Sequence, residues 1–185
     1  MLSPKIGPIA TGIVAALSLT ALPACAQDSS QHMDTGSQKM LSSADTTFAM
    51  KAAQGGMAEV KFGQLAVEKA SNPDVKAFGQ KMVDDHTKLN DQMKQVASAE
   101  NMTLPTDIDG KDQAAYDKLS KLSGADFDKA YIKGMVKDHS TDVKEFQKEA
   151  NGGKDPQLKQ LASTALPILQ SHLQMAKETE AKLGK

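Results

Sequence analysis

Two short segments of the sequence end in a histidine behind nearly the same lead, MVDDH at residues 82–86 and MVKDH at residues 135–139. A third histidine, His172, lies in the segment LPILQSHLQMA. Imidazole nitrogens bind first-row transition metals, and carboxylates often complete such sites. The residues whose types suit metal chemistry are Glu59, His86, His139 and His172.

Each of these four residues is the polar member of an apolar stripe with helical spacing, near the middle of a long helical pattern. Because the midpoints of antiparallel helices lie side by side in a bundle, we expect the four side chains to meet at one level of the core. A buried imidazole or carboxylate without a partner is costly, so these groups should contact one another or a metal ion. The pattern predicts a metal site, with a metal-free layer of hydrogen-bonded side chains as the alternative.

Three aspartates near the histidines have predicted supporting roles. Asp85 and Asp138 each precede a histidine by one residue, about 100° round the helix. They are expected to accept a hydrogen bond from an imidazole of a neighbouring helix. Asp142 lies one turn after His139 and is the candidate for an additional oxygen ligand.

The predicted ligands suit iron, manganese or zinc. Copper is the alternative, because methionines lie one helical turn from the histidines, at Met82, Met135 and Met175. Thioether and imidazole ligands together favour copper, especially Cu(I). Methionine also fills gaps in cores that are short of aromatic residues, so both interpretations of the three methionines stay open.

Four long helical patterns must position these residues, at about residues 44–70, 73–101, 124–151 and 156–183. The second begins at NPD (residues 72–74), where asparagine is the expected N-cap and proline takes the first turn. The fourth begins at a similar Asp-Pro pair. The third follows Ser123-x-x-Asp126, which predicts a capping box at Ser123.

The connections between these patterns predict the topology. Short connections make the first and second helices antiparallel, and likewise the third and fourth. The connection at residues 102–124 is longer and contains KDQAAYDKLSKL, which predicts a short helix. Such a connection can run the length of a bundle. The sequence therefore predicts an all-α, ferritin-like four-helix bundle with one long crossover.

The N-terminal segment, residues 1–26, is typical of a signal peptide, with Lys5, an uncharged apolar run and the small residues of PACAQ. Cleavage before Gln27 would release a soluble periplasmic protein. LPAC also resembles a lipoprotein box, in which Cys25 becomes the acylated first residue, although Pro23 is unusual there. Membrane contact is expected only through the signal or this anchor. Residues 27–43 are polar and predict a flexible spacer before the domain at residues 44–185.

Composition narrows the classes of function. All 22 basic residues are lysines and the net charge is −1, which argues against nucleic acid as a partner. With Cys25 as the one cysteine, cysteine chemistry is excluded from the domain. The chain contains no G-x-S-x-G, H-E-x-x-H, P-loop or C-x-x-C motif, so no catalytic residue is predicted. A metal ion is the one partner that the residues indicate.

Four segments, in order AAQGGMAEVKFGQLA, NPDVKAFGQKMVDDHTK, FDKAYIKGMVKDH and LPILQSHLQMA, resemble the signature segments of domain of unknown function 4142. The resemblance covers about residues 45–182. It implies a ferritin-like bundle exported to the bacterial cell envelope, periplasmic or associated with the outer membrane. It implies no reaction, and no helix carries the Glu-x-x-His of di-iron proteins. A metal-free structural or stress-related interaction module and a metal-dependent oxidoreductase are the alternative functions.

Overall fold

The computed structural model describes residues 41–184, which form five α-helices and no strand. The helices are α1 (Ser43–Lys69), α2 (Pro73–Ala99), α3 (Gly110–Leu119), α4 (Gly124–Gly152) and α5 (Pro156–Leu183). The predicted signal peptide, Cys25 and nearly all of the predicted spacer lie outside the described residues. Within residues 41–184, no helix is both long enough and apolar enough to span a membrane.

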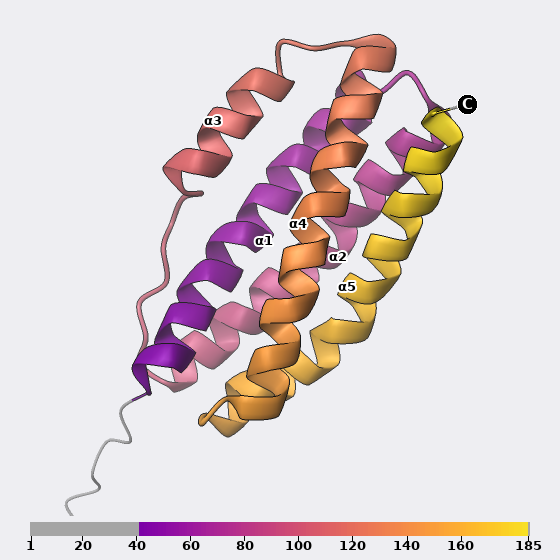
Figure 1. Cartoon of the computed structure of the whole chain (residues 1–185). Coiled ribbons are helices and arrows are strands. Elements are labelled where there is room, and N and C mark those ends of the chain that lie inside the picture. The colour runs from indigo at the N-terminus through magenta and orange to yellow at the C-terminus, as the bar shows by residue number, and fades with distance from the viewer. Residues whose placement is uncertain (1–40, 185) are drawn as a thin grey trace, which may run out of the picture. The chain divides into compact units, whose positions relative to one another are not determined.

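The four long helices form an antiparallel bundle built from two hairpins, α1–α2 and α4–α5 (Figure 1). The hairpins pack through α1 against α4 and through α2 against α5. The chain between α2 and α4 runs back along the bundle, with the short helix α3 against α1 and α4. The all-α class and the single long crossover are therefore confirmed, with the short crossover helix as a fifth helix beside the four of the bundle.

Side-chain caps start three of the four long helices, with Ser42 capping α1 through the backbone N–H group of Asp45. The carboxamide of Asn72 accepts hydrogen bonds from the backbone N–H groups of Asp74 and Val75, as the sequence predicts. Asp155 caps α5 in the same way. The capping box predicted at Ser123 is wrong, because this side chain makes no capping hydrogen bond. The chain turns there at Gly124, whose φ of 58° is in the left-handed region that favours glycine.

Two apolar clusters occupy the two ends of the bundle. The cluster nearer the α1–α2 turn includes Phe62, Phe78 and Tyr131, and the cluster at the other end includes Phe48 and Leu158. The three predicted ligand histidines lie between the two clusters along their helices, and Glu59 lies where the cluster nearer the α1–α2 turn begins, next to Ala58. The core is therefore apolar at both ends and polar at the middle level.

Two buried aspartates tie each hairpin to the turn of the other. Asp128 of α4 accepts hydrogen bonds from the backbone N–H groups of Ser71, at 3.1 Å, and Asn72, at 2.9 Å. Asp45 of α1 accepts hydrogen bonds from the backbone N–H groups in the α4–α5 turn, at Lys154 and Asp155, at 3.0 and 3.1 Å. Both aspartates are 1% exposed. Buried backbone donors need such partners, so these contacts fix how the hairpins dock.

Close contact between α1 and α2 depends on a pair of glycines. A Cβ atom added at Gly63 would lie 2.7 Å from the carbonyl oxygen of Gly79, and one at Gly79 would lie 2.7 Å from the Cβ atom of Ala66. Such distances are too short for real side chains. The two helices therefore approach as closely as they do because neither position carries a side chain.

Candidate metal centre

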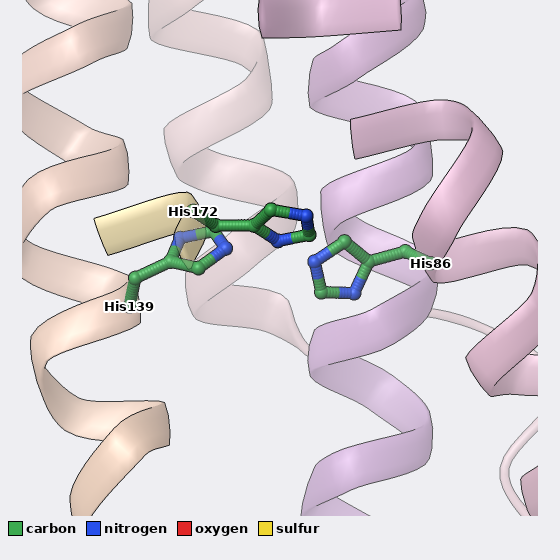
Figure 2. Close-up of side chains that lie close together, drawn as sticks. All are labelled: His86, His139 and His172. Carbon is green, nitrogen blue, oxygen red and sulfur yellow. The ribbon is translucent and has the colours of Figure 1, made fainter. Parts of the chain in front are cut away.

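Three histidines from three helices converge at the middle level of the bundle. His86 comes from α2, His139 from α4 and His172 from α5, and their rings turn toward one another (Figure 2). Each ring offers one nitrogen, and these three nitrogens all lie within 4.8 Å of one another. All three side chains are buried. The matched depth that the sequence indicates for the histidines thus places them in contact.

The hydrogen bonds of two rings assign which nitrogen carries the proton. His139 Nδ1 lies 3.1 Å from the carbonyl oxygen of Met135 and donates to it. His172 Nε2 lies 2.9 Å from Oδ2 of Asp85 and donates to that carboxylate. The other nitrogen of each neutral ring is then a lone-pair acceptor. These acceptors, His139 Nε2 and His172 Nδ1, are buried and have no partner in the described part of the chain, and the same holds for His86 Nε2.

Burial keeps the three imidazoles neutral. It lowers the pKa of His86 to about 3, with the neighbouring histidines as a further cause. Burial also lowers the pKa of His139 to about 4, followed by the effect of His172. The pKa of His172 is lowered mainly by burial, against the opposing effect of Asp85. Neutral imidazole is the form that binds metal ions, so the rings are ligands at neutral pH without losing a proton.

The dimensions of the histidine cluster fit a transition-metal ion. Metal–nitrogen bonds of about 2.0–2.1 Å place the nitrogens of a tetrahedral site about 3.3 Å apart. The present limit of 4.8 Å exceeds that spacing by about 1.5 Å at most, which small side-chain rotations can close. Three imidazoles leave a fourth position for water or another ligand.

Glu59 lies beside the imidazole cluster and not within it. Its Oε1 is 3.7 Å from Nδ1 of His139, and it forms a separate group with His139 and Asp142 whose ligand atoms lie within 4.8 Å of one another. Burial, followed by the charges of Asp142 and other aspartates, raises the pKa of Glu59 well above its usual range. The predicted set of four ligands therefore divides into two groups that share His139.

The predicted supporting aspartates differ in position. Asp85 receives the hydrogen bond from His172 of the neighbouring helix and also a salt bridge from Lys81 at 2.8 Å. A carboxylate in this place orients the imidazole and raises its basicity as a ligand. Asp138 makes no hydrogen bond to a histidine among the described residues. It lines a cavity instead.

The three methionines contact the apolar cluster at the α1–α2 end. Met82 and Met135 are buried members of that cluster, and Met175 is partly buried against it. Met135 also supplies the backbone carbonyl that orients His139. These positions account for the methionines as core residues, one turn from the imidazoles.

A cavity of about 270 Å³ reaches Glu59 and His86 from the surface between α1, α4 and the start of α3. Asp112, Asp138 and Asp142 line it, with lysines at its exposed edge. Burial, followed by the charges of Asp138 and other acidic residues, raises the pKa of Asp142 to about 7. The pKa of Asp112 and that of Asp138 are also raised, mainly by burial. The cavity is therefore lined by partly buried carboxyl groups and lies beside the imidazoles.

Two polar residues of this region were not predicted from the sequence. Asp112 belongs to the crossover, and no helical period relates it to the stripes of the bundle. Tyr131 lies on the apolar stripe of its helix, yet its hydroxyl group is buried with no hydrogen-bond partner among residues 41–184. Burial and the charge of Glu59 raise its pKa well above the usual range. The available signal was its position, two helical turns before His139 on the same stripe.

Fold and site together define a class of protein: an α-helical bundle with a buried cluster of imidazoles and an adjoining cavity of carboxyl groups. The chain belongs to the family described as Domain of unknown function (DUF4142), whose profile matches residues 30–179. The resemblance noted in the sequence is thus confirmed. None of the curated proteins compared with the chain matches it.

Two solved structures share the fold at low sequence identity. A DUF305 fragment from Deinococcus radiodurans has a TM-score of 0.66 at 13% identity, covering 78% of this chain and 98% of that one. A "putative secreted protein DUF305" from Streptomyces coelicolor has a TM-score of 0.65 at 15% identity, covering 76% of this chain and 94% of that one. At these identities the similarity shows the helical fold alone.

Proposed function

We propose that the bundle binds one transition-metal ion through His86, His139 and His172. The observation that supports this function is the set of three buried ring nitrogens, one from each residue, that have no hydrogen-bond partner within residues 41–184. Buried polar atoms are normally paired, and an unpaired one costs about 1–3 kcal/mol. A metal ion bound by all three rings would satisfy these atoms at once.

The donor set favours particular metals. Imidazole nitrogens suit zinc, iron and copper, whereas manganese prefers oxygen ligands. Zn²⁺ or Fe²⁺ is therefore the proposed ion, with water in the fourth position. Copper is the alternative, with the thioethers of Met82 and Met135 one helical turn from the rings. We propose metal binding for the imidazole cluster and no reaction.

We also propose that the protein is exported to the periplasm. The signal-like segment at residues 1–26 supports export, and the Streptomyces coelicolor protein of similar fold is itself described as a "putative secreted protein". The mass of the mature protein distinguishes the two forms of processing. A chain that begins at Gln27 supports a soluble protein, whereas an acylated Cys25 supports a lipid anchor at the membrane.

The metal proposal is tested on the chain from Gln27 onward, which contains the whole bundle, produced without a histidine tag. Bound metals are measured by mass spectrometry, and thermal stability is compared with and without Zn²⁺, Fe²⁺, Mn²⁺ and Cu²⁺. We expect one metal ion per chain and a stabilisation that rises with metal concentration. With Zn²⁺ or Fe²⁺, both the bound ion and the stabilisation should be lost in the His86→Ala/His139→Ala double variant.

The His32→Ala variant is the matched control, because this histidine lies in the predicted spacer and should not affect binding. Copper-specific stabilisation that Met82→Leu and Met135→Leu abolish would assign the soft-ligand site. A folded chain with no bound metal and no stabilisation by any of the four ions would contradict the proposal. The histidines would then form a metal-free polar layer.

A further inference from the structure

Glu59 of α1 and Asp142 of α4 form a carboxylate pair between the two hairpins. Each offers an oxygen atom, and these lie within 4.8 Å of one another and of a nitrogen of His139. Glu59 is 4% exposed, and its Oε2 is buried with no hydrogen-bond partner among the residues that the structure describes. Two carboxylates this close, one of them buried and the other half-buried, require a compensating positive charge or a shared proton.

No side chain in the described part of the chain forms an ion pair with Glu59 or Asp142, and the charge of Lys111, at the exposed edge of the cavity, only partly opposes the raised pKa of Asp142. Nδ1 of His139 donates its proton to the carbonyl oxygen of Met135, and it lies 3.7 Å from Oε1 of Glu59. Lysines line the cavity only at its exposed edge, and none forms a salt bridge with Glu59 or Asp142 within residues 41–184. Lys51 is engaged by Glu145 at 3.5 Å.

The space beside the pair suits an ion that retains water molecules. The cavity of about 270 Å³ extends from Glu59 and Asp142 to the surface, so water can reach the two carboxylates. Carboxylate and water oxygens are the ligands that hard divalent cations prefer, whereas the imidazole cluster has the nitrogen donors of a softer site. The two groups of ligands are therefore chemically distinct although both are adjacent to His139.

We propose that Glu59 and Asp142 bind a hard divalent cation such as Mn²⁺, with water from the cavity completing its coordination. The ion lies on the cavity side of His139, separate from the imidazole cluster. This second site goes beyond the proposed function, because its ligands bind whether or not the imidazoles hold a metal. Asp138, also in the cavity wall, adds negative charge that attracts the cation.

The test uses the chain from Gln27 onward with one equivalent of Zn²⁺ already bound. Mn²⁺ is titrated, and the electron paramagnetic resonance signal of free Mn²⁺ counts the ions that bind. We expect one Mn²⁺ per chain. Glu59→Gln and Asp142→Asn should each lower its affinity by at least about tenfold, because each removes a charged ligand of almost unchanged shape. Zinc content should stay unchanged in both variants.

Glu145→Gln is the matched control, because Glu145 lines the same cavity but stands outside the ligand group and pairs with Lys51. Its Mn²⁺ affinity should stay within about twofold of the parent chain, a small effect for a rim charge. A second measurement uses His86→Ala, which should lose Zn²⁺ and keep Mn²⁺. Loss of Zn²⁺ binding from the parent chain would count against the proposed function alone.

Three results would overturn the second site. Folded parent chain that binds no Mn²⁺ would mean that the carboxylates share a proton. Unchanged Mn²⁺ affinity in Glu59→Gln and Asp142→Asn would place the ion elsewhere. Mn²⁺ binding that is lost in His86→Ala and kept in Glu59→Gln would mean that the ion occupies the imidazole cluster.

Discussion

Replacing His86 with leucine should stabilise the bundle when no metal is present and destabilise it when metal is bound. His86 is 4% exposed, and its Nε2 has no hydrogen-bond partner. A buried polar atom in that state costs about 1–3 kcal/mol. Leucine is close to imidazole in size and has no polar atom, so the metal-free variant should gain about that much in free energy of unfolding.

The metal-free difference should grow as the pH falls. Burial holds the pKa of His86 at about 3 in the folded protein, against 6.5 for an ordinary histidine. Between these values the unfolded chain binds a proton that the folded chain does not, so the folded state loses up to about 1.4 kcal/mol per pH unit. From pH 7 to pH 5 the parent chain should lose about 2 kcal/mol relative to the variant. The carboxyl groups are the same in both chains, so their effects on the pH dependence of stability largely cancel in the comparison.

Metal reverses the sign of the difference. At pH 7, an ion at one thousand times its dissociation constant stabilises the folded protein by about 4.1 kcal/mol, which exceeds the gain of about 1–3 kcal/mol without metal, and the leucine variant should lose most of it. Urea unfolding followed by circular dichroism measures the difference in free energy of unfolding between parent and variant. The measurement is made with a chelator and with Zn²⁺, each at pH 7 and at pH 5. A variant that is less stable than the parent chain in chelator at both pH values would refute the argument from the unpaired nitrogen.

Three further changes test the parts of the bundle that support the site. Asp85→Asn should weaken Zn²⁺ binding by about 10–100-fold, because the imidazole of α5 loses its orienting carboxylate, and competition with a coloured chelator measures it. Asp128→Asn should lower the free energy of unfolding in urea by about 2–3 kcal/mol, since buried donors of the α1–α2 turn lose a charged acceptor, while zinc content per folded chain stays the same. Gly63→Ala should destabilise by about 1–3 kcal/mol, because the added Cβ would meet a backbone carbonyl of α2. Gly134→Ala is its control: this helical glycine has open space around it, and alanine there should raise the melting temperature slightly.

The sequence predicts the helices well because their signals are local. Asn72 and Pro73 fix the start of α2 through bonds to residues that follow directly, and the predicted start agrees with the structure. The capping box predicted at Ser123 does not form, because its geometry depends on how the backbone turns at the next residue. That residue, Gly124, has a left-handed conformation, which a pattern of residue types does not indicate.

The convergence of the histidines also follows from the sequence, since it needs only their depth along each helix. The placement of Glu59 does not, because it depends on the rotation of α1 about its own axis, and a helix with many alanines and glycines has no narrow apolar stripe to define that rotation. Asp45 lies in the first turn of α1 and Asp128 just beyond the first turn of α4. Their bonds are not predicted from the sequence, because acidic residues near a helix start usually interact with their own helix end. Nothing in their neighbourhood indicates a bond to a distant turn.

The reciprocal bonds of these two aspartates have a consequence for the history of the chain. Asp128 follows Asp45 by the same number of residues as Pro156 follows Pro73, and the two hairpins hold each other's turns by the same contacts. Such a relation is what duplication of one ancestral helical hairpin would leave, with the two copies related by an approximate twofold axis.

Asp142 follows Glu59 by the same number of residues as Asp128 follows Asp45. The two members of the carboxylate pair therefore occupy equivalent positions in the two hairpins. The histidines do not obey it: His86 corresponds to Leu169, and His172 corresponds to Leu89. A hairpin that paired with an identical copy would already have placed two carboxyl groups face to face across its axis. The imidazole cluster would then have arisen later, because its histidines occupy non-equivalent positions and so require two hairpins of different sequence.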